Sequence, residues 1–362
     1  MARIDRLLLG MREADASDLH MVAGQKPKYR VDGDIRVIDD HPLLDADLLG
    51  EYLFEIISHE QRDRYRTHHD FDFAYGIGQE ARYRCNYFFQ RTGYGAVFRL
   101  IPTRVLTLED LKLPEILGRL AELRSGLVLV TGPTGSGKST TLAAMVDHIN
   151  SRYRKHIVTI EDPVEFVHEN RKSIITHREV GTHTESFAAA LRSIPRQDAD
   201  VVLVGEMRDL ETIGLAITAA SMGTVVFGTL HTNSAAKTVD RIIDVFPSDQ
   251  QAQIRTMLAE SLRAIVAQQL LRKKGSHGRV AALEVLICTH AVASIIREGK
   301  IEKLFSILQS GKREGMQSMD DALESLVKQG MIDGADAYAK AHEKQRFEAH
   351  LSGATEPANP PH

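Results

Sequence analysis

The segment at 132–139, which reads Gly-Pro-Thr-Gly-Ser-Gly-Lys-Ser, constrains this chain more than any other. It matches G-x-x-x-x-G-K-[ST], the pattern of a phosphate-binding loop. An apolar run at 127–130 precedes the loop and is typical of a buried strand, and the residues at 140–150 favour a helix. Strand, glycine-rich turn and helix come in the order that the pattern requires. We therefore predict a nucleotide site here rather than a glycine-rich turn that matches by chance.

The residue types in this loop suit the binding of a triphosphate such as ATP. Gly135 and Gly137 let the backbone approach phosphate oxygens, because no Cβ stands in the way. The N–H groups of the turn and of the helix N-terminus would then face the anion. We expect Lys138 to reach the outer phosphates and the Ser139 hydroxyl to bind Mg²⁺. The residues expected to contact the nucleotide are Gly132, Pro133, Thr134, Gly135, Ser136, Gly137, Lys138, Ser139 and Thr140.

The composition is that of an ordinary globular protein. The chain has 362 residues, 43% of them apolar and 26% charged, which is enough for two or three domains. The formal net charge of −4 shows no basic excess, so we expect no nucleic-acid partner. Cys85 and Cys288 offer neither a metal-ligand spacing nor a disulfide framework, which favours a cytoplasmic setting. No apolar run approaches the roughly 18 residues of a membrane-spanning helix.

Residues 1–100 are predicted to form a small α+β domain. The turn at 32–34, Asp-Gly-Asp, lies between short strands and predicts a hairpin. Pro102 then marks a linker at 101–113. The other elements expected in this domain are an amphipathic helix within residues 1–15, a helical stretch at 44–65 and strands at 71–75, 81–90 and 96–100.

Residues 114–290 show a different pattern, in which apolar strands alternate with helical segments. This alternation predicts an α/β domain with a mostly parallel sheet covered by helices. The expected strands are 127–131, 156–161, 173–177, 201–205, 224–230 and 281–287, and the expected helices are 138–151, 186–193, 209–221 and 249–270. A helical region should follow at 291–350, and the end of the chain at 351–362 should be disordered.

A carboxylate lies at the end of two of the predicted strands. Glu206 directly follows the run at 201–205, and Glu161 is the last residue of the run at 156–161. Ligands bind at the carboxyl ends of strands in an open parallel sheet, so both acids should lie near the phosphates. The usual pattern has Asp where this chain has Gly205. Glu206 could therefore assist Mg²⁺ through water, act on the attacking water, or merely cap the next helix.

Glu161 is our preferred general base. It belongs to a group of three acids within five residues, and such a group is costly unless a cation or a water network lies nearby. Glu165 is a weaker candidate, for a supporting role. Taken alone, the cluster could equally be a turn with solvated acids.

A histidine and several arginines complete the candidate set. His231 follows the strand at 224–230 and could hydrogen-bond the γ-phosphate, although a lone histidine there is more often structural. Arg82 and Arg84 alternate along one strand and should face the same side, where they could neutralise transition-state charge or form a solvated face. Further candidates are Arg192, Arg196 and Arg208.

Several long motifs together resemble those of the secretion ATPases of type II secretion and type IV pili. Beside the phosphate-binding loop, which corresponds to the Walker A box, the resemblance covers residues from about 16 to about 330. The matching segments are ASDLH at 16–20, TIEDPVE at 159–165, REVG at 178–181, VLVGEMRDLETI at 202–213, GTLHTNSA at 228–235 and IREGK at 296–300.

This resemblance implies an ATP-hydrolysing homohexamer with a PAS-like N-terminal domain and a RecA-like P-loop ATPase core. It implies that Glu161 of the aspartate box is the base and that Glu206 of the Walker B box supports Mg²⁺ and water. The segment around His231 corresponds to the histidine box. Arg82 and Arg84 would reach the phosphates when the domains close, and Mg²⁺ would contact Ser139 and Glu206.

Within the family, the chain is most similar to the retraction branch of type IV pilus motors. It begins almost directly at the PAS-like domain and lacks the four-cysteine module of extension and secretion members. The resemblance therefore implies pilus retraction and twitching motility, in the cytoplasm at the inner face of the membrane, on a pilus platform protein. Residues 291–300 read AVASIIREGK where the branch usually reads close to AVRNLIREGK. An accessory role beside a paralogous pilus ATPase, a nucleotide-gated scaffold and a DNA-translocating motor remain open as alternatives.

Overall fold

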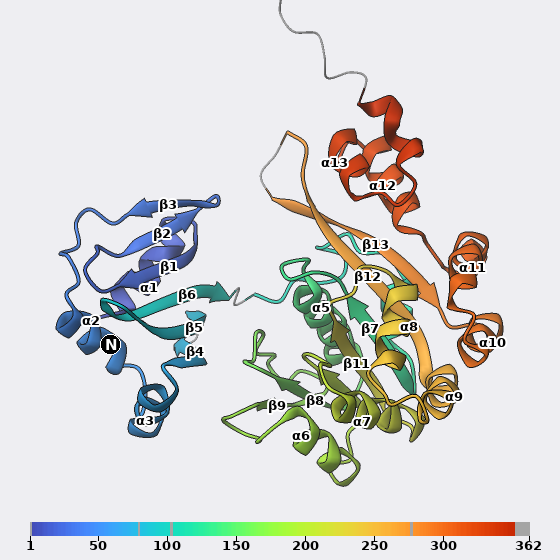
Figure 1. Ribbon diagram of the computed structural model, residues 1–362, viewed down its shortest axis with the longest axis horizontal. Helices are drawn as coiled ribbons and strands as arrows, with labels where there is room; N and C mark the ends of the chain where they lie inside the picture. The colour runs from blue at the N-terminus through green and yellow to red at the C-terminus, as the bar shows by residue number, and fades with distance from the viewer. Residues whose placement is uncertain (1, 79, 102–103, 276–277, 352–362) are drawn as a thin grey trace, which may run out of the picture. The chain divides into compact units, whose positions relative to one another are not determined.

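The computed structural model describes residues 2–78, 80–101, 104–275 and 278–351. It divides into two compact units, each with its own sheet and hydrophobic core (Figure 1). The first unit contains residues 1–105 together with 162–167, and the second contains 106–161 together with 168–362. Most of the predicted disordered tail, residues 352–362, lies outside the described residues.

The first unit is built on an antiparallel sheet of six strands in the order β3-β2-β1-β6-β5-β4. Alternate side chains of each strand point to opposite faces, and one face carries the core. In β5, for example, Tyr83, Cys85 and Tyr87 are fully buried, whereas the residues between them are not. The strands are β1 (Ala16–Val22), β2 (Lys28–Val31), β3 (Asp34–Val37), β4 (Asp70–Ile77), β5 (Ala81–Gln90) and β6 (Gly93–Ile101).

Three helices contribute to this core: α1 (Asp5–Glu13), α2 (Ala46–Phe54) and α3 (His59–His68). The predicted N-terminal helix and the predicted hairpin at 28–37 are both present. The expected helical stretch at 44–65 is instead two helices. The Ser58 side chain accepts from the Gln61 backbone N–H, and the Gln61 side chain accepts in return from Ser58, which starts a new helix there. β1 is a strand that the local sequence pattern did not predict.

The second unit contains a seven-stranded sheet in the order β13-β12-β7-β11-β10-β8-β9. All neighbouring pairs are parallel except β12 and β13, as expected for an α/β domain with a RecA-like core. The strands are β7 (Gly126–Thr131), β8 (His156–Glu161), β9 (Ile174–Glu179), β10 (Val201–Val204), β11 (Val225–Leu230), β12 (Leu262–Arg272) and β13 (Arg279–Ile287).

Helices cover both faces of this sheet, so its central strands are apolar throughout rather than alternating. In β7, Leu127 and Leu129 face a core shared with α7, α8 and α9, whereas Val128 and Val130 face a core shared with α4 and α5. The helices of this part are α4 (Ile116–Ala121), α5 (Lys138–Arg152), α6 (Phe187–Ser193), α7 (Leu210–Ser221), α8 (Ala235–Asp244) and α9 (Gln251–Ser261).

One predicted helix is wrong in its C-terminal part, residues 262–270. The helix expected at 249–270 ends at Ser261, and β12 begins at Leu262. Short apolar runs do not distinguish a helix from a buried strand. These residues form a strand because residues 262–267 pair with 127–131 of β7 in a parallel ladder. As a result, β12 lies beside the phosphate-binding loop.

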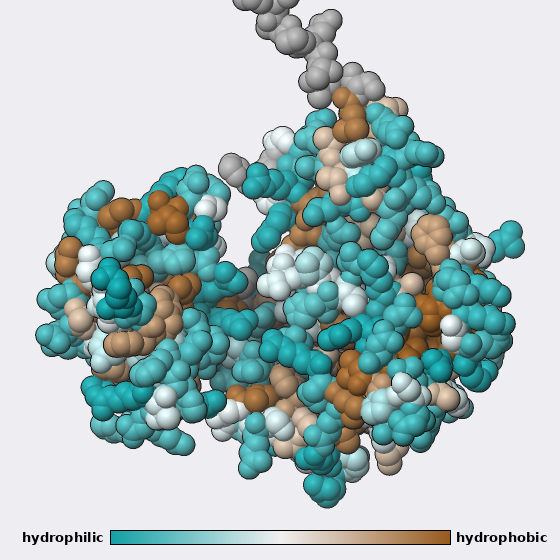
Figure 2. Space-filling model, viewed as in Figure 1, coloured by the Kyte–Doolittle hydropathy of each residue, from teal (hydrophilic) through white to brown (hydrophobic). Residues whose placement is uncertain are grey.

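The C-terminal region is helical, as predicted. Two of its helices pack against the far ends of β12 and β13, around Met319, Leu323 and Phe347. Its helices are α10 (His290–Glu298), α11 (Leu304–Ser310), α12 (Met319–Lys328) and α13 (Gly334–Lys340). On the visible face of each unit, hydrophilic residues predominate (Figure 2). Among the described residues, no helix has the length and apolarity that crossing a membrane requires.

Candidate nucleotide-binding site

The loop at 132–137 joins the end of β7 to the start of α5 (Figure 1). Gly132, Gly135 and Gly137 have φ values of 145°, 77° and 86°, a region that residues with a Cβ rarely adopt. Two of these glycines also have no room for a side chain. A Cβ at Gly132 would lie 2.3 Å from the backbone oxygen of Gln268, and a Cβ at Gly137 would lie 2.8 Å from Gln268 Nε2. The loop therefore depends on these glycines for its shape.

Two polar side chains of the loop are arranged as an anion site requires. Ser136 is 3% exposed, and within the described part of the chain its Oγ has no hydrogen-bond partner. A buried hydroxyl without a partner is costly, and a ligand oxygen would satisfy it. Lys138 Nζ donates to the backbone oxygens of Gly132 and Pro133, at 2.9 and 3.1 Å. The ammonium group is thus held over its own loop, and Pro133, Thr134 and Gly135 are exposed. These features fit a phosphate group.

The other candidates of this unit follow the carboxyl ends of neighbouring parallel strands. In the sheet order β7-β11-β10-β8, the loop follows β7, His231 follows β11, Glu206 comes two residues after β10, and Glu161 ends β8. Adjacent strands lie about 4.8 Å apart, so Glu206 comes from one strand nearer to the loop than Glu161 does. The structure thus brings to one edge of the sheet residues that are up to 100 positions apart in the chain.

Glu206 has two cationic or titratable neighbours. Arg208 Nε lies 2.5 Å from Glu206 Oε1, and His231 Nε2 lies 3.0 Å from the same oxygen. Partial burial works to raise the pKa of Glu206, but the hydrogen bond and charge of Arg208, with a smaller contribution from His231, lower it overall. Glu206 is therefore a carboxylate at neutral pH. Arg208, one of the further arginine candidates, has a defined partner here, whereas Arg192 pairs with Glu211.

Glu161 is half-buried at the end of β8, beside the turn that follows β10. The Gly205 N–H donates to the backbone oxygen of Ile160 at 2.8 Å. A Cβ at Gly205 would lie 3.3 Å from Glu161 Cα and 3.4 Å from its Cγ. The glycine found where the usual pattern has Asp therefore leaves space for Glu161. Glu165, the weaker candidate, is also half-buried.

Arg82 and Arg84 belong to the other unit, where both lie on β5. They share the face opposite the buried Tyr83 and Cys85, in agreement with the alternation. Arg82 is half-buried, and its Nε donates to the backbone oxygen of Val164 at 3.2 Å. Arg84 is exposed and lies opposite Arg99 of β6. Their part in the chemistry stays a prediction.

Sequence reasoning missed one residue that contacts the loop. Gln268 of β12 is 2% exposed, and its side chain hydrogen-bonds the loop and α5. It was missed because residues 249–270 were predicted to be a helix, which would place this glutamine away from the loop. The β-branched pair Ile265-Val266 just before it was the available signal for a strand.

The residues that could hold Mg²⁺ are Ser139 and Glu206. In the described ranges, no group of three or more His, Cys, Asp or Glu side chains could hold a metal ion. Mg²⁺ in nucleotide sites commonly takes one or two protein ligands and completes its shell with phosphate oxygens and water. A hydroxyl and a carboxylate at this edge of the sheet are compatible with such binding.

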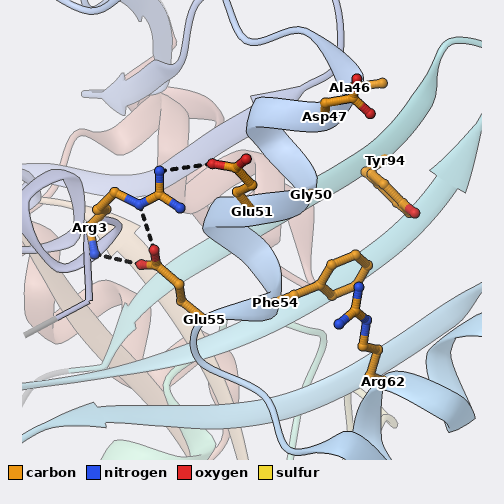
Figure 3. Close-up of a pocket in the computed structure, with 9 residues that line it drawn as sticks. All are labelled: Arg3, Ala46, Asp47, Gly50, Glu51, Phe54, Glu55, Arg62 and Tyr94. Carbon is orange, nitrogen blue, oxygen red and sulfur yellow. Dashed lines mark hydrogen bonds and ion pairs between the residues drawn. The ribbon is translucent and has the colours of Figure 1, made fainter.

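The first unit has a pocket, but none of the predicted site residues lines it (Figure 3). On one side of α2, Arg3 contacts Glu51 at 2.9 Å and Glu55 at 2.5 Å. The guanidinium of Arg62 stacks over the ring of Phe54, 4.1 Å from its centroid. The acidic side chains of this pocket make it a poor site for a phosphate.

Comparison with known proteins gives consistent results. Residues 2–339 match the family described as Type II/IV secretion system protein. The chain is 49% identical to the type IV pilus retractation ATPase PilT of Pseudomonas aeruginosa, over 95% of this chain and 99% of that protein. It is 40% identical to the type IV pilus ATPase PilU of the same organism, over 93% and 88%.

A solved structure is also similar over most of its length. It is the crystal structure of the pilus retraction motor PilT with bound ADP, which has a TM-score of 0.88 and 41% sequence identity. The match covers 96% of this chain and 99% of that one.

Proposed function

The chain belongs to the Type II/IV secretion system protein family, and on that premise we propose that it is an ATP-hydrolysing motor that powers type IV pilus retraction. The observation that carries the proposal is the buried Ser136 hydroxyl, which has no hydrogen-bond partner among the described residues, in a loop where Gly132 and Gly137 leave no room for a side chain. A loop with these features is suited to binding phosphate. The similarity to a retraction motor with bound ADP over 96% of the chain supports the same conclusion.

In this proposal the loop residues from Gly132 to Thr140 hold ATP. Lys138 leaves the carbonyl oxygens of Gly132 and Pro133 and contacts the outer phosphates, and Ser139 binds Mg²⁺. The metal ion supplies charge neutralisation on the phosphate oxygens when it is bound. Backbone N–H groups at the N-terminus of α5 add to this attraction for anions.

The two acids have different roles in the proposed site. Glu206 has a lowered pKa because of Arg208 and His231, which makes it a weak base and a suitable carboxylate for Mg²⁺ and its water. Glu161, for which Gly205 leaves room, orients the attacking water and takes its proton. His231, which follows β11 and contacts Glu206, responds to the presence or loss of the γ-phosphate.

Arg82 and Arg84 are proposed to neutralise charge on the phosphates when nucleotide closes the two units on each other. Loss of the γ-phosphate would release that closure, and in a homohexameric ring the movement would pass to the next subunit. The motor would act in the cytoplasm, at the inner face of the membrane, on a pilus platform protein.

An accessory role beside a principal retraction ATPase is the second candidate. One observation favours it: α10 carries Ala293-Ser294 where the retraction branch usually has Arg-Asn. The greater identity to PilT, 49% against 40% for PilU of the same organism, favours the principal role.

Deletion of the gene, followed by counts of surface pili and assays of surface motility, tests the proposal. Retraction predicts more pili and less motility, with rescue by the wild-type gene and none by Lys138→Ala. Lys237→Ala, an exposed lysine of α8, is the matched control and should rescue. Fewer pili in the deletion strain would contradict retraction. Purified wild-type chain should also release phosphate from ATP, because a nucleotide-gated scaffold would release almost none.

A further inference from the structure

Gln268 contacts the phosphate-binding loop from a strand that follows it by more than 100 residues. It lies on β12, which pairs with β7 in parallel up to Ala267 and Thr131, so Gln268 comes beside the first residue of the loop. It is 2% exposed although its side chain is an amide. Burial of an amide is costly unless both of its ends are hydrogen-bonded.

Both ends of this amide are used. Gln268 Nε2 donates to the backbone oxygen of Ser136 at 2.6 Å, and its Oε1 accepts from Thr141 Oγ1 at 2.7 Å. The carbonyl oxygen of Ser136 can only accept, so the amide nitrogen must face it. The orientation of the side chain is therefore determined, and its two contacts bracket residues 137–140.

The backbone of β12 also touches the loop. The backbone oxygen of Gln268 lies 2.3 Å from where a Cβ of Gly132 would be, and its Nε2 lies 2.8 Å from where a Cβ of Gly137 would be. The loop is thus packed against Gln268 at both of its ends. Rigid backbone N–H groups bind an anion better than mobile ones, because less order has to be created on binding.

We infer that Gln268 is a positioning residue for nucleotide binding, which holds the loop and the first turn of α5 in the shape that receives the phosphates. It acts through Ser136 and Thr141 and needs no contact of its own with the nucleotide. This inference rests on the proposed function, because it concerns the same loop.

Three variants test it in the full chain. Gln268→Leu keeps a similar volume and removes both hydrogen bonds, and Gln268→Glu keeps the acceptor but turns a carboxylate toward the Ser136 oxygen. Gln269→Leu is the matched control, because Gln269 is the next residue of β12 and is only half-buried. ADP affinity is measured by titration calorimetry, and loop order by hydrogen exchange of residues 132–141 in the absence of nucleotide.

Gln268→Leu and Gln268→Glu should weaken ADP binding about 10- to 100-fold, the loss expected when buried hydrogen-bonding groups lose their partners. Both should also speed exchange in the loop of the free protein, and Gln269→Leu should do neither. If the Gln268 variants do not fold, Thr141→Val removes one contact with almost no change in shape and should also weaken ADP binding. Thr141→Ser keeps the hydroxyl and should bind ADP as the wild type does.

Two outcomes separate this inference from the function on which it rests. Wild-type affinity and wild-type loop exchange in Gln268→Leu would overturn the positioning role and leave the proposed function intact. Failure of the wild-type chain to bind ADP would overturn the proposed function itself.

Discussion

His231 Nε2 lies 3.0 Å from Oε1 of Glu206, so the tips of β11 and β10 are joined by a direct side-chain contact. Arg208 Nε contacts the same oxygen at 2.5 Å. Glu206 and His231 are close because β10 and β11 are parallel neighbours, and parallel strands present their carboxyl ends at one edge, whereas Arg208 follows Glu206 by two residues in the chain. Glu206 is therefore held in one orientation and one charge state.

The first prediction concerns the two acids. Glu161→Gln should lower the rate of ATP hydrolysis by about 10²- to 10⁴-fold, the range for loss of a general base, and should leave ADP affinity nearly unchanged. Glu206→Gln should lower the rate and also raise the Mg²⁺ concentration that gives half of the maximal rate, because a carboxylate proposed to bind Mg²⁺ is lost. The measurement is steady-state phosphate release at a series of Mg²⁺ concentrations. Glu169→Gln, which changes an exposed acid of the same segment, is the control. Near wild-type rates in both active-site variants would refute the assignment.

The second prediction uses the lowered pKa of Glu206. Burial alone would raise this pKa, and Arg208 is the main group that lowers it. Arg208→Ala should therefore shift the acidic limb of the pH–rate profile toward higher pH, because Glu206 becomes protonated sooner as the pH falls. Arg241 is an exposed arginine of α8, and Arg241→Ala should leave the pH of the acidic limb unchanged. A limb that stays fixed in Arg208→Ala would show that Glu206 does not govern it.

The third prediction concerns Gly205. Gly205→Ala would add a Cβ 3.2 Å from the Ile160 oxygen and 3.3 Å from Glu161 Cα, so the end of β8 that carries Glu161 must shift by a few tenths of an ångström. Since misplacement of a reacting group lowers rates steeply, turnover should fall about tenfold or more with little change in thermal stability. In Gly214→Ala the new Cβ would make only an ordinary contact, 3.8 Å from the Phe246 ring. That variant should keep its turnover, and equal rates in both variants would contradict the role given to Gly205.

The fourth prediction is a pH dependence of stability. Burial, with smaller effects of His177 and Arg171, lowers the pKa of His168 from 6.5 to about 4. The unfolded chain then binds more protons than the folded chain between these values, so the free energy of unfolding falls as the pH drops from about 6.5 to 4. The full loss from this residue is about 3 kcal/mol.

Urea unfolding at several pH values measures this effect. His168→Gln should flatten the dependence on pH in that window, because the group that takes up the proton on unfolding is gone. His290→Gln, at an exposed position at the start of α10, should leave the slope unchanged. The same slope in His168→Gln and in the wild type would show that other groups determine it.

The phosphate-binding loop, the parallel sheet around it and the antiparallel hairpin at 28–37 were all predictable from local patterns. Gly135, Gly137 and Lys138 allow the loop to be predicted, because phosphate binding requires small residues and a cation at fixed spacings. Glu161, Glu206 and His231 could be predicted as candidates because each follows an apolar run, and the direction of a parallel strand determines which end meets a ligand; their roles stay predictions.

Other features depended on contacts between distant segments. Residues 262–272 became a strand because β7 offered a free edge beside them, a fact that no local pattern contains. Gln268 therefore went unnoticed, and so did the packing of β12 against Gly132. The contact of His231 with Glu206 likewise required the order of the strands.

The chain's own sequence determined which groups are available to bind a phosphate and which strand ends they follow, because those properties come from spacing, backbone freedom and apolar runs. The tertiary structure decided which of these groups touch. Contacts between side chains depend on strand order and close packing, and both arise only when segments far apart in the chain are buried against one another.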